Sequence, residues 1–138
     1  AARANLLLKE PKQAVDYSLR LLVLNKNNRD ALSIAGVAYI NLKEFKLAEG
    51  AFKKIINSGN INSSDLHNLG IVLIAQGKYM EGSDRIFEAA TIAMENKQDK
   101  KIYRSFRKLK KLSENDPYAN RLYKELGKSV YDYLSIKY

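Results

Sequence analysis

Several residue types are scarce or missing in this sequence, and each absence excludes certain kinds of functional site. There is no cysteine, which excludes a disulfide framework, a thiol nucleophile and a cysteine-ligated metal site. A single histidine supports neither a catalytic triad nor a metal site, and no carboxylate pair stands at ligand spacing. No apolar run reaches the roughly 18 residues of a membrane-spanning helix, and no phosphate-loop motif is present. We therefore expect no enzyme, no cofactor and no metal.

Length and composition fit one globular domain. The chain has 138 residues, of which 46% are hydrophobic and 28% charged, without a Pro/Gly/Ser-rich linker. It opens AARANLLLKE, without an initiator methionine and inside an expected helix, so we expect a fragment or a processed product. The compartment stays open: the cytoplasm is preferred, and the periplasm fits a processed fragment.

The chain contains an internal repeat of 34 residues. The stretch AGVAYINLKEFKLAEG (35–50) aligns without a gap on LGIVLIAQGKYMEGSD (69–84). A further step of 34 places Ala48 on Ala14, so the chain carries two full repeats and the back half of another. The superposed pairs are Gly36 and Gly70, Tyr39 and Leu73, Phe45 and Tyr79, Ala48 and Gly82, and Phe52 and Ile86.

Each repeat predicts two helices joined by a tight turn. Apolar residues recur at helical spacing in the first helices, at Leu32, Ala35, Tyr39 and Leu42 and again at Leu66, Leu69, Leu73 and Ile74. We expect second helices at 45–57 and 79–96, turns at 43–44 and 76–78, a helix at 98–112, and a last helix running from SENDPY to about residue 134. The predicted N-caps are Asn28, Ser63 or Ser64, and Asp116, and Pro11 fits the first turn of its helix.

Two glycines, Gly36 and Gly70, fall in the middle of predicted helices. Glycine costs up to about 1 kcal/mol there relative to alanine. A close helix crossing would offset this cost, and Gly82 would allow the same approach from the second helix of its repeat. Gly77 has a separate role, because glycine past a helix end supplies the left-handed backbone of a C-cap.

The repeated positions carry a family resemblance. The series Leu66, Leu69, Gly70, Leu73, Gly77, Tyr79, Gly82, Ile86 and Ala89 resembles the tetratricopeptide repeat, and the middle repeat matches through Ala35, Gly36, Tyr39, Phe45, Ala48 and Phe52. The usual closing proline is absent at Asn60, and Leu32 and Leu66 stand where tryptophan is common. The resemblance covers residues 1–96. It implies an all-α fold of antiparallel helix-turn-helix repeats in a right-handed superhelix, with the first repeat truncated.

The last third of the chain, 97–138, lies outside the part of the sequence that resembles the repeat. We assign it to the same solenoid domain as the repeats, because a solenoid needs atypical terminal elements to cover its last apolar face. It is either a C-terminal capping helix pair or a degenerate fourth repeat with a capping helix. Its expected apolar stripes are Ile102, Phe106, Leu109 and Leu112 in the first helix, and Leu122, Leu126 and Val130 in the second.

The resemblance implies a partner-binding groove on the concave face, which the first helices of the repeats form. One subgroup of the family grips a C-terminal carboxylate there with lysines and asparagines; serine, histidine, valine and isoleucine stand at those places here, so that clamp is absent. The groove floor is instead apolar, and it either binds a partner peptide or packs against neighbouring helices. The implied groove residues are Asp30, Ser33, Val37, Ile40 and Asn41, followed by Ser64, His67, Ile71, Ile74 and Ala75.

The segment KQDKKIYRSFRKLKK (97–111) carries most of the excess charge. From residue 97 onward there are 12 basic and 5 acidic residues, a net charge of +7 out of +9 for the chain. Such a patch, with Tyr103 and Phe106 interleaved, is able to hold nucleic acid, an anionic membrane surface or an acidic protein partner. No recognised nucleic-acid motif accompanies it, and a solvated helix face of a lysine-rich chain is the alternative. The basic residues are Lys97, Lys100, Lys101, Arg104, Arg107, Lys108, Lys110 and Lys111.

Two classes of function follow. The first is a non-catalytic adaptor that binds a partner peptide in the groove, as in bacterial secretion, pilus-assembly or other multiprotein complexes. The second is a repeat domain that positions its basic segment on nucleic acid or an anionic membrane. An exposed end of the solenoid would also allow a homodimer.

Overall fold

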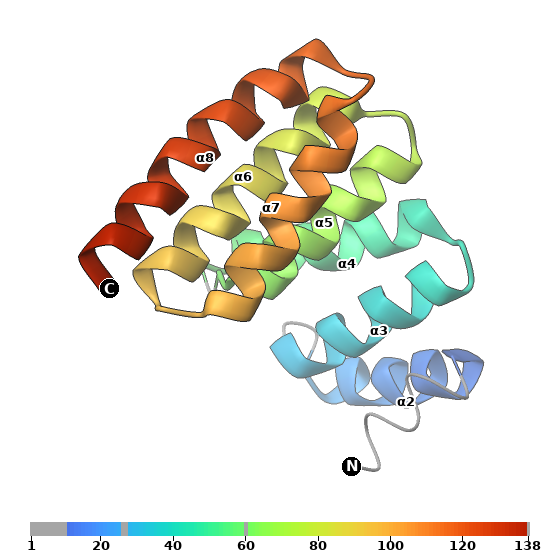
Figure 1. Ribbon diagram of the computed structural model, residues 1–138. Coiled ribbons are helices and arrows are strands. Elements are labelled where there is room, and N and C mark those ends of the chain that lie inside the picture. Colours follow the sequence, from blue (N-terminus) through green and yellow to red (C-terminus); the bar gives the residue numbers. More distant parts are fainter. Residues whose placement is uncertain (1–10, 26–27, 60, 138) are drawn as a thin grey trace. The chain divides into compact units, whose positions relative to one another are not determined.

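The computed structural model describes residues 11–25, 28–59 and 61–137, and every regular element in these ranges is an α-helix (Figure 1). The all-α prediction is therefore confirmed for the described part of the chain. The chain divides into two compact units, residues 1–61 and 62–138, so the predicted division after residue 96 falls inside the second unit. The opening segment of the truncated repeat, 1–10, lies outside the described residues.

The first unit contains α2 (Pro11–Leu24), α3 (Arg29–Asn41) and α4 (Phe45–Asn57). The middle helix, α3, contacts both others. Ala14 of α2 and Ala38 of α3 are fully buried against Ile34, and the Phe52 ring of α4 is completely enclosed. Small residues on α2 and α3 thus let the helices approach, while one large ring fills the space beside α4.

The second unit contains α5 (Ser63–Ala75), α6 (Tyr79–Glu95), α7 (Asp99–Ser113) and α8 (Pro117–Lys137). α6 is its central helix, because it contacts α5, α7 and α8. The core cluster takes one or two residues from each of three helices: Ile86, Ala90, Leu109 and Leu126.

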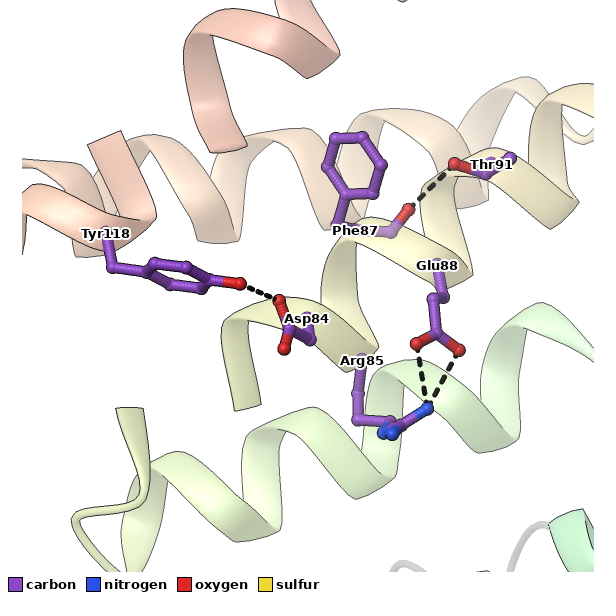
Figure 2. Close-up of polar contacts among 6 residues, drawn as sticks. All are labelled: Asp84, Arg85, Phe87, Glu88, Thr91 and Tyr118. Atoms are coloured by element: carbon purple, nitrogen blue, oxygen red, sulfur yellow. Dashed lines mark hydrogen bonds and ion pairs between the residues drawn. The ribbon is translucent and has the colours of Figure 1, made fainter. Parts of the chain in front are cut away.

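Phenol-carboxylate hydrogen bonds tie α8 to the rest of the second unit. Figure 2 shows the Tyr118 hydroxyl of α8 donating to Asp84 of α6, above a pairing of Arg85 with Glu88 along α6. Near the other end of α8, the Tyr133 hydroxyl donates to Asp99 Oδ1 of α7 at 2.7 Å. The last helix is therefore held at two widely separated points, and it runs to Lys137, beyond the predicted end near residue 134.

The helix ends agree in part with the predicted caps. The Asn28 side chain accepts the Ala31 N–H at 3.0 Å, and Asp116 accepts the Ala119 N–H at 3.2 Å, so both predicted caps are confirmed. The prediction of Ser63 or Ser64 was wrong, because Asn62 caps α5 by accepting the Asp65 N–H at 2.8 Å. An asparagine is as good an N-cap as a serine, and the sequence offers both side by side.

The turns between paired helices fall where they were predicted. Gly77 adopts a φ of +81°, the left-handed conformation expected of it. Lys43 holds the equivalent place in the preceding repeat with a φ of 60°, although it carries a side chain. The two turns thus share the same left-handed backbone conformation, although only the second has a glycine at this position.

Close helix crossing at the mid-helix glycines is confirmed. A Cβ atom added to Gly70 would lie 2.5 Å from Ile86 Cγ1 and 2.8 Å from the Gly82 carbonyl oxygen. One added to Gly82 would lie 2.6 Å from Ile74 Cγ1 and 2.9 Å from the Gly70 carbonyl oxygen. The two backbones of α5 and α6 therefore meet face to face, at a distance that no other residue permits. In the first unit, a Cβ at Gly36 would instead meet the Phe52 ring at 2.6 Å.

Replacing Gly70 with alanine should destabilise the second unit by about 1–3 kcal/mol, because the added methyl group meets backbone as well as side chain. The matched control is Gly127→Ala in α8, where the new Cβ would lie 3.8 Å from the Phe106 ring, an ordinary contact. That variant should gain up to about 1 kcal/mol from helix propensity. Urea denaturation followed by circular dichroism measures both changes. A Gly70→Ala variant as stable as the parent would contradict the close crossing.

Candidate functional site

The predicted groove residues of the middle repeat lie on α3, in the first unit. Asp30 and Asn41, at the two ends of the helix, are exposed, while Ser33, Val37 and Ile40 are partly buried. Asp30 and Asn41 both take part in polar interactions within the chain. This part of the predicted groove therefore combines a partly covered apolar strip with polar ends.

The predicted groove residues of the next repeat lie on α5, in the second unit. Most of them are in contact with neighbouring helices of that unit. Ser64 is partly buried, and His67 is only 6% exposed. Ile71 and Ile74 pack against the core cluster that contains Ile86 and Leu109. For these two isoleucines, packing against neighbouring helices is thus what the structure shows, and Ala75 at the end of the helix is exposed.

His67 makes a specific contact with α7. Its Nδ1 lies 2.8 Å from the Ser105 hydroxyl, in a buried pair that joins residues 38 positions apart. Burial, with smaller contributions from the positive charges of Arg104 and Lys108, lowers the pKa of His67 from 6.5 to about 4. The imidazole is therefore neutral at physiological pH, and it lies close to two cations of the predicted basic segment.

The basic segment forms α7 and the turn before it, and its charges separate onto two flanks. Arg104 and Lys108 face the α5 side, since both act on His67. Lys101 and Lys111 precede and follow them at the three-residue spacing that puts side chains on one flank of a helix. Arg107 belongs to the other flank, where its guanidinium lies 5.0 Å from the centre of the Tyr103 ring. Lys110 follows Arg107 at the same spacing, Lys100 is exposed in the first turn, and Lys97 lies in the turn before the helix.

Two surfaces that were predicted separately therefore meet in the second unit. We call this surface the α5–α7 face and define it by Ser64, His67 and Ile71 of α5 and Lys101, Arg104, Lys108 and Lys111 of α7. Partial burial lowers the pKa of Arg104 and that of Lys108, and neighbouring Lys111 lowers the latter further. Among the described residues, none of the four cations forms an ion pair. The face thus carries four positive charges, none of which has a described carboxylate within ion-pair distance.

A cleft of about 420 Å³ continues this face at the C-terminal end of α7. It is lined by Lys108, Lys111 and Leu112 of α7 and by Tyr79 from the start of α6, a residue that is 52% exposed. The same cleft is also lined by the polar and acidic residues Glu114, Asn115 and Asp116. The Asp116 carboxylate already accepts the Ala119 N–H, so it is committed to the start of α8.

The aromatic residues interleaved in the basic segment do not lie on this face. Phe106 packs against Tyr123 of α8, with ring centres 5.0 Å apart. Tyr103 and Phe106 both line an apolar cleft between α7 and α8, together with Ile102, Val130 and Leu134. Arg104 and Lys108 therefore lie on a different side of α7 from these two rings, whereas Arg107 lies on the same side as Tyr103.

Sequence reasoning missed Ser105 and Gln98 as partners of α5. Ser105 is 1% exposed and holds His67, and the Ser63 hydroxyl donates to Gln98 Oε1 at 3.1 Å. A signal for Ser105 was present, because it stands three residues after Ile102 and four before Leu109, in the apolar stripe of α7. A polar residue in such a position needs a partner. No comparable signal singles out Gln98.

Comparison of the chain with protein-family models, curated proteins and solved structures gives no match. What the structure supports is an all-helical protein of packed hairpins, compatible with a helical repeat protein. In the ranges that the structure describes, no helix is long and apolar enough to span a membrane. Nor do three or more histidine, aspartate or glutamate side chains gather there as metal ligands would.

The buried His67 predicts a loss of stability in acid. Its pKa is lower in the folded chain than in the unfolded one, so the unfolded state binds the proton first and stability falls with pH below about 6.5. Between about pH 7.5 and about pH 5 this residue should cost about 2 kcal/mol. His67→Asn keeps a hydrogen-bonding group near Ser105 and should lack this loss when the two chains are compared by urea denaturation. Because the chain has one histidine, an NMR titration assigns its pKa directly; a value near 6.5 would contradict the burial.

Proposed function

We propose that the chain is a non-catalytic interaction module of the tetratricopeptide type, an adaptor that holds a segment of a partner protein on the α5–α7 face. The 34-residue period supports the repeat assignment, because Gly36 meets Phe52 and Gly70 meets Ile86 at equivalent positions of the two repeats. A right-handed superhelix and a role in a bacterial secretion, pilus-assembly or other multiprotein complex are the finer parts of this proposal, carried by the resemblance.

The observation that carries the proposal is the convergence of the predicted groove and the predicted basic segment. His67 comes from the groove and Arg104 and Lys108 from the basic segment, yet they belong to one face of the second unit. A half-buried cation without an ion pair, such as Lys108, costs free energy that a fully solvated cation would not. A partner that pairs with the cations would offset this cost.

The same geometry speaks against the nucleic-acid alternative. Proteins that bind single strands combine a cationic track with aromatic rings on which bases stack. Phe106 packs against Tyr123 of α8, and Tyr103 lies beside Arg107 on the other flank, so neither ring stands beside Arg104 and Lys108. Tyr79 lines the cleft only at the Lys111 end of the row, where a single ring cannot stack successive bases. A membrane-surface helix needs a free apolar face, whereas Ile102 and Leu109 of α7 are buried in the unit. The α5–α7 face therefore fits a segment of a protein better than it fits a nucleic acid or an anionic membrane surface.

The location of the binding site can be tested by attaching a bulky label to single residues. This test does not depend on the chemical nature of the partner. The chain has no cysteine, so Lys108→Cys and Lys110→Cys each introduce one thiol for a maleimide-linked polyethylene glycol. Peptides selected by phage display of a random library against the parent chain should bind at least about tenfold more weakly to labelled Lys108→Cys. Binding to labelled Lys110→Cys should stay within about twofold.

Lys110 is the matched control because it lies on the same helix, loses the same charge and carries the same label. Fluorescence polarisation of the synthesised peptides gives the two affinities, and circular dichroism confirms that both variants fold. If the two labels weaken peptide binding equally, or if neither label weakens it, the binding site is not on the α5–α7 face.

A further inference from the structure

Four cations follow one another along α7 on the α5–α7 face, over the eleven residues from Lys101 to Lys111. At about 1.5 Å per residue the row is about 15 Å long. An extended peptide covers this length with about five residues, of which alternate side chains point toward the row. The row therefore matches a short segment of one partner chain.

The wall opposite this row is electrically neutral. α5 contributes Ser64, His67 and Ile71 to the face, and the histidine is uncharged because it is buried. No carboxylate of α5 shares their helical spacing, and Asp65, the nearest one in sequence, is itself buried. The residues that define the face thus carry charge of one sign.

We infer that the occupant of the α5–α7 face is an acidic peptide segment, whose carboxylates pair with Arg104 and Lys108. This inference rests on the proposed function and adds the chemistry of the partner. Lys101 and Lys111 extend the pairing toward the two ends of the row. Because Lys108 is half-buried, a carboxylate placed beside it gains more than it would at an open surface, and the exposed Arg104 guanidinium is accessible to a second carboxylate.

The adjoining cleft sets the direction of the segment. It offers the exposed Tyr79 ring and Leu112 to an apolar side chain, beside Lys108 and Lys111. Glu114 and Asp116, which follow Leu112 in the sequence, line the same cleft and repel further carboxylates. The segment therefore places its acidic residues along the middle of α7 and an apolar residue at the C-terminal end of that helix.

The test is a selection from a random twelve-residue phage-display library against the folded chain, repeated on two charge-reversed variants. Arg104→Glu with Lys108→Glu reverses the centre of the face, and Arg107→Glu with Lys110→Glu reverses the outer flank. Each pair exchanges one arginine and one lysine of α7, so both variants change net charge equally. Circular dichroism verifies that each variant folds, and Arg104→Gln with Lys108→Gln provides a milder second variant.

Peptides selected on the parent chain should be enriched in aspartate and glutamate around an apolar residue. The synthesised peptides should bind at least about tenfold more weakly to the Arg104/Lys108 variant, and within about twofold to the Arg107/Lys110 variant. Versions of these peptides with glutamine and asparagine in place of glutamate and aspartate should bind the parent chain at least about tenfold more weakly. Binding of the acidic peptides should weaken as salt rises.

Other outcomes separate the two proposals. Peptides that are blocked by the label at Lys108→Cys but carry no acidic residues would overturn the acidic partner and leave the interaction module standing. Peptides insensitive to that label would overturn both. If a single-stranded oligonucleotide or phosphatidylserine vesicles bind more tightly than the selected peptides, and only the Arg104/Lys108 variant loses them, the occupant is not a peptide and the inference fails.

Discussion

The close approach of Gly70 and Gly82 is the constraint on which the second unit depends. With no side chain between them, the backbones of α5 and α6 meet, and each glycine leaves room for an isoleucine of the other helix. Ile86 then lies in the same core cluster as Leu109 of α7. The position of α7, and with it the row of cations beside α5, follows from how closely these two backbones cross.

Burial of one polar pair completes this arrangement. The contact between His67 and Ser105 fixes how α7 is rotated against α5, because a buried imidazole must direct its ring nitrogen at a partner. That rotation presents Arg104 and Lys108 beside α5 and sends Phe106 toward α8. A single hydrogen bond between residues far apart in the sequence thus decides which residues of the basic segment share a surface with the repeat helix.

Much of the local structure was predictable from the sequence, because it depends on residues close together in the chain. Helical spacing located α4, α6 and α7 to within a residue or two, and the mid-helix glycines correctly indicated a close crossing. Contacts between distant residues were not predictable in this way. Nothing local shows that His67 is enclosed by a serine 38 positions away, or that Lys43 adopts the turn conformation of a glycine. The candidate site was therefore predicted as two separate sets of residues, and only the packing of α7 on α5 relates them.

The order of helix contacts in the second unit also bears on how the protein forms. Helices there pack only on neighbours one or two places away in the chain, so every loop that must close is short. Topologies of this kind fold quickly, since little chain entropy is lost before the first contacts form. Each hairpin can be completed as soon as its second helix leaves the ribosome, and the α5–α7 face is the first surface of the unit that has to wait for a third helix.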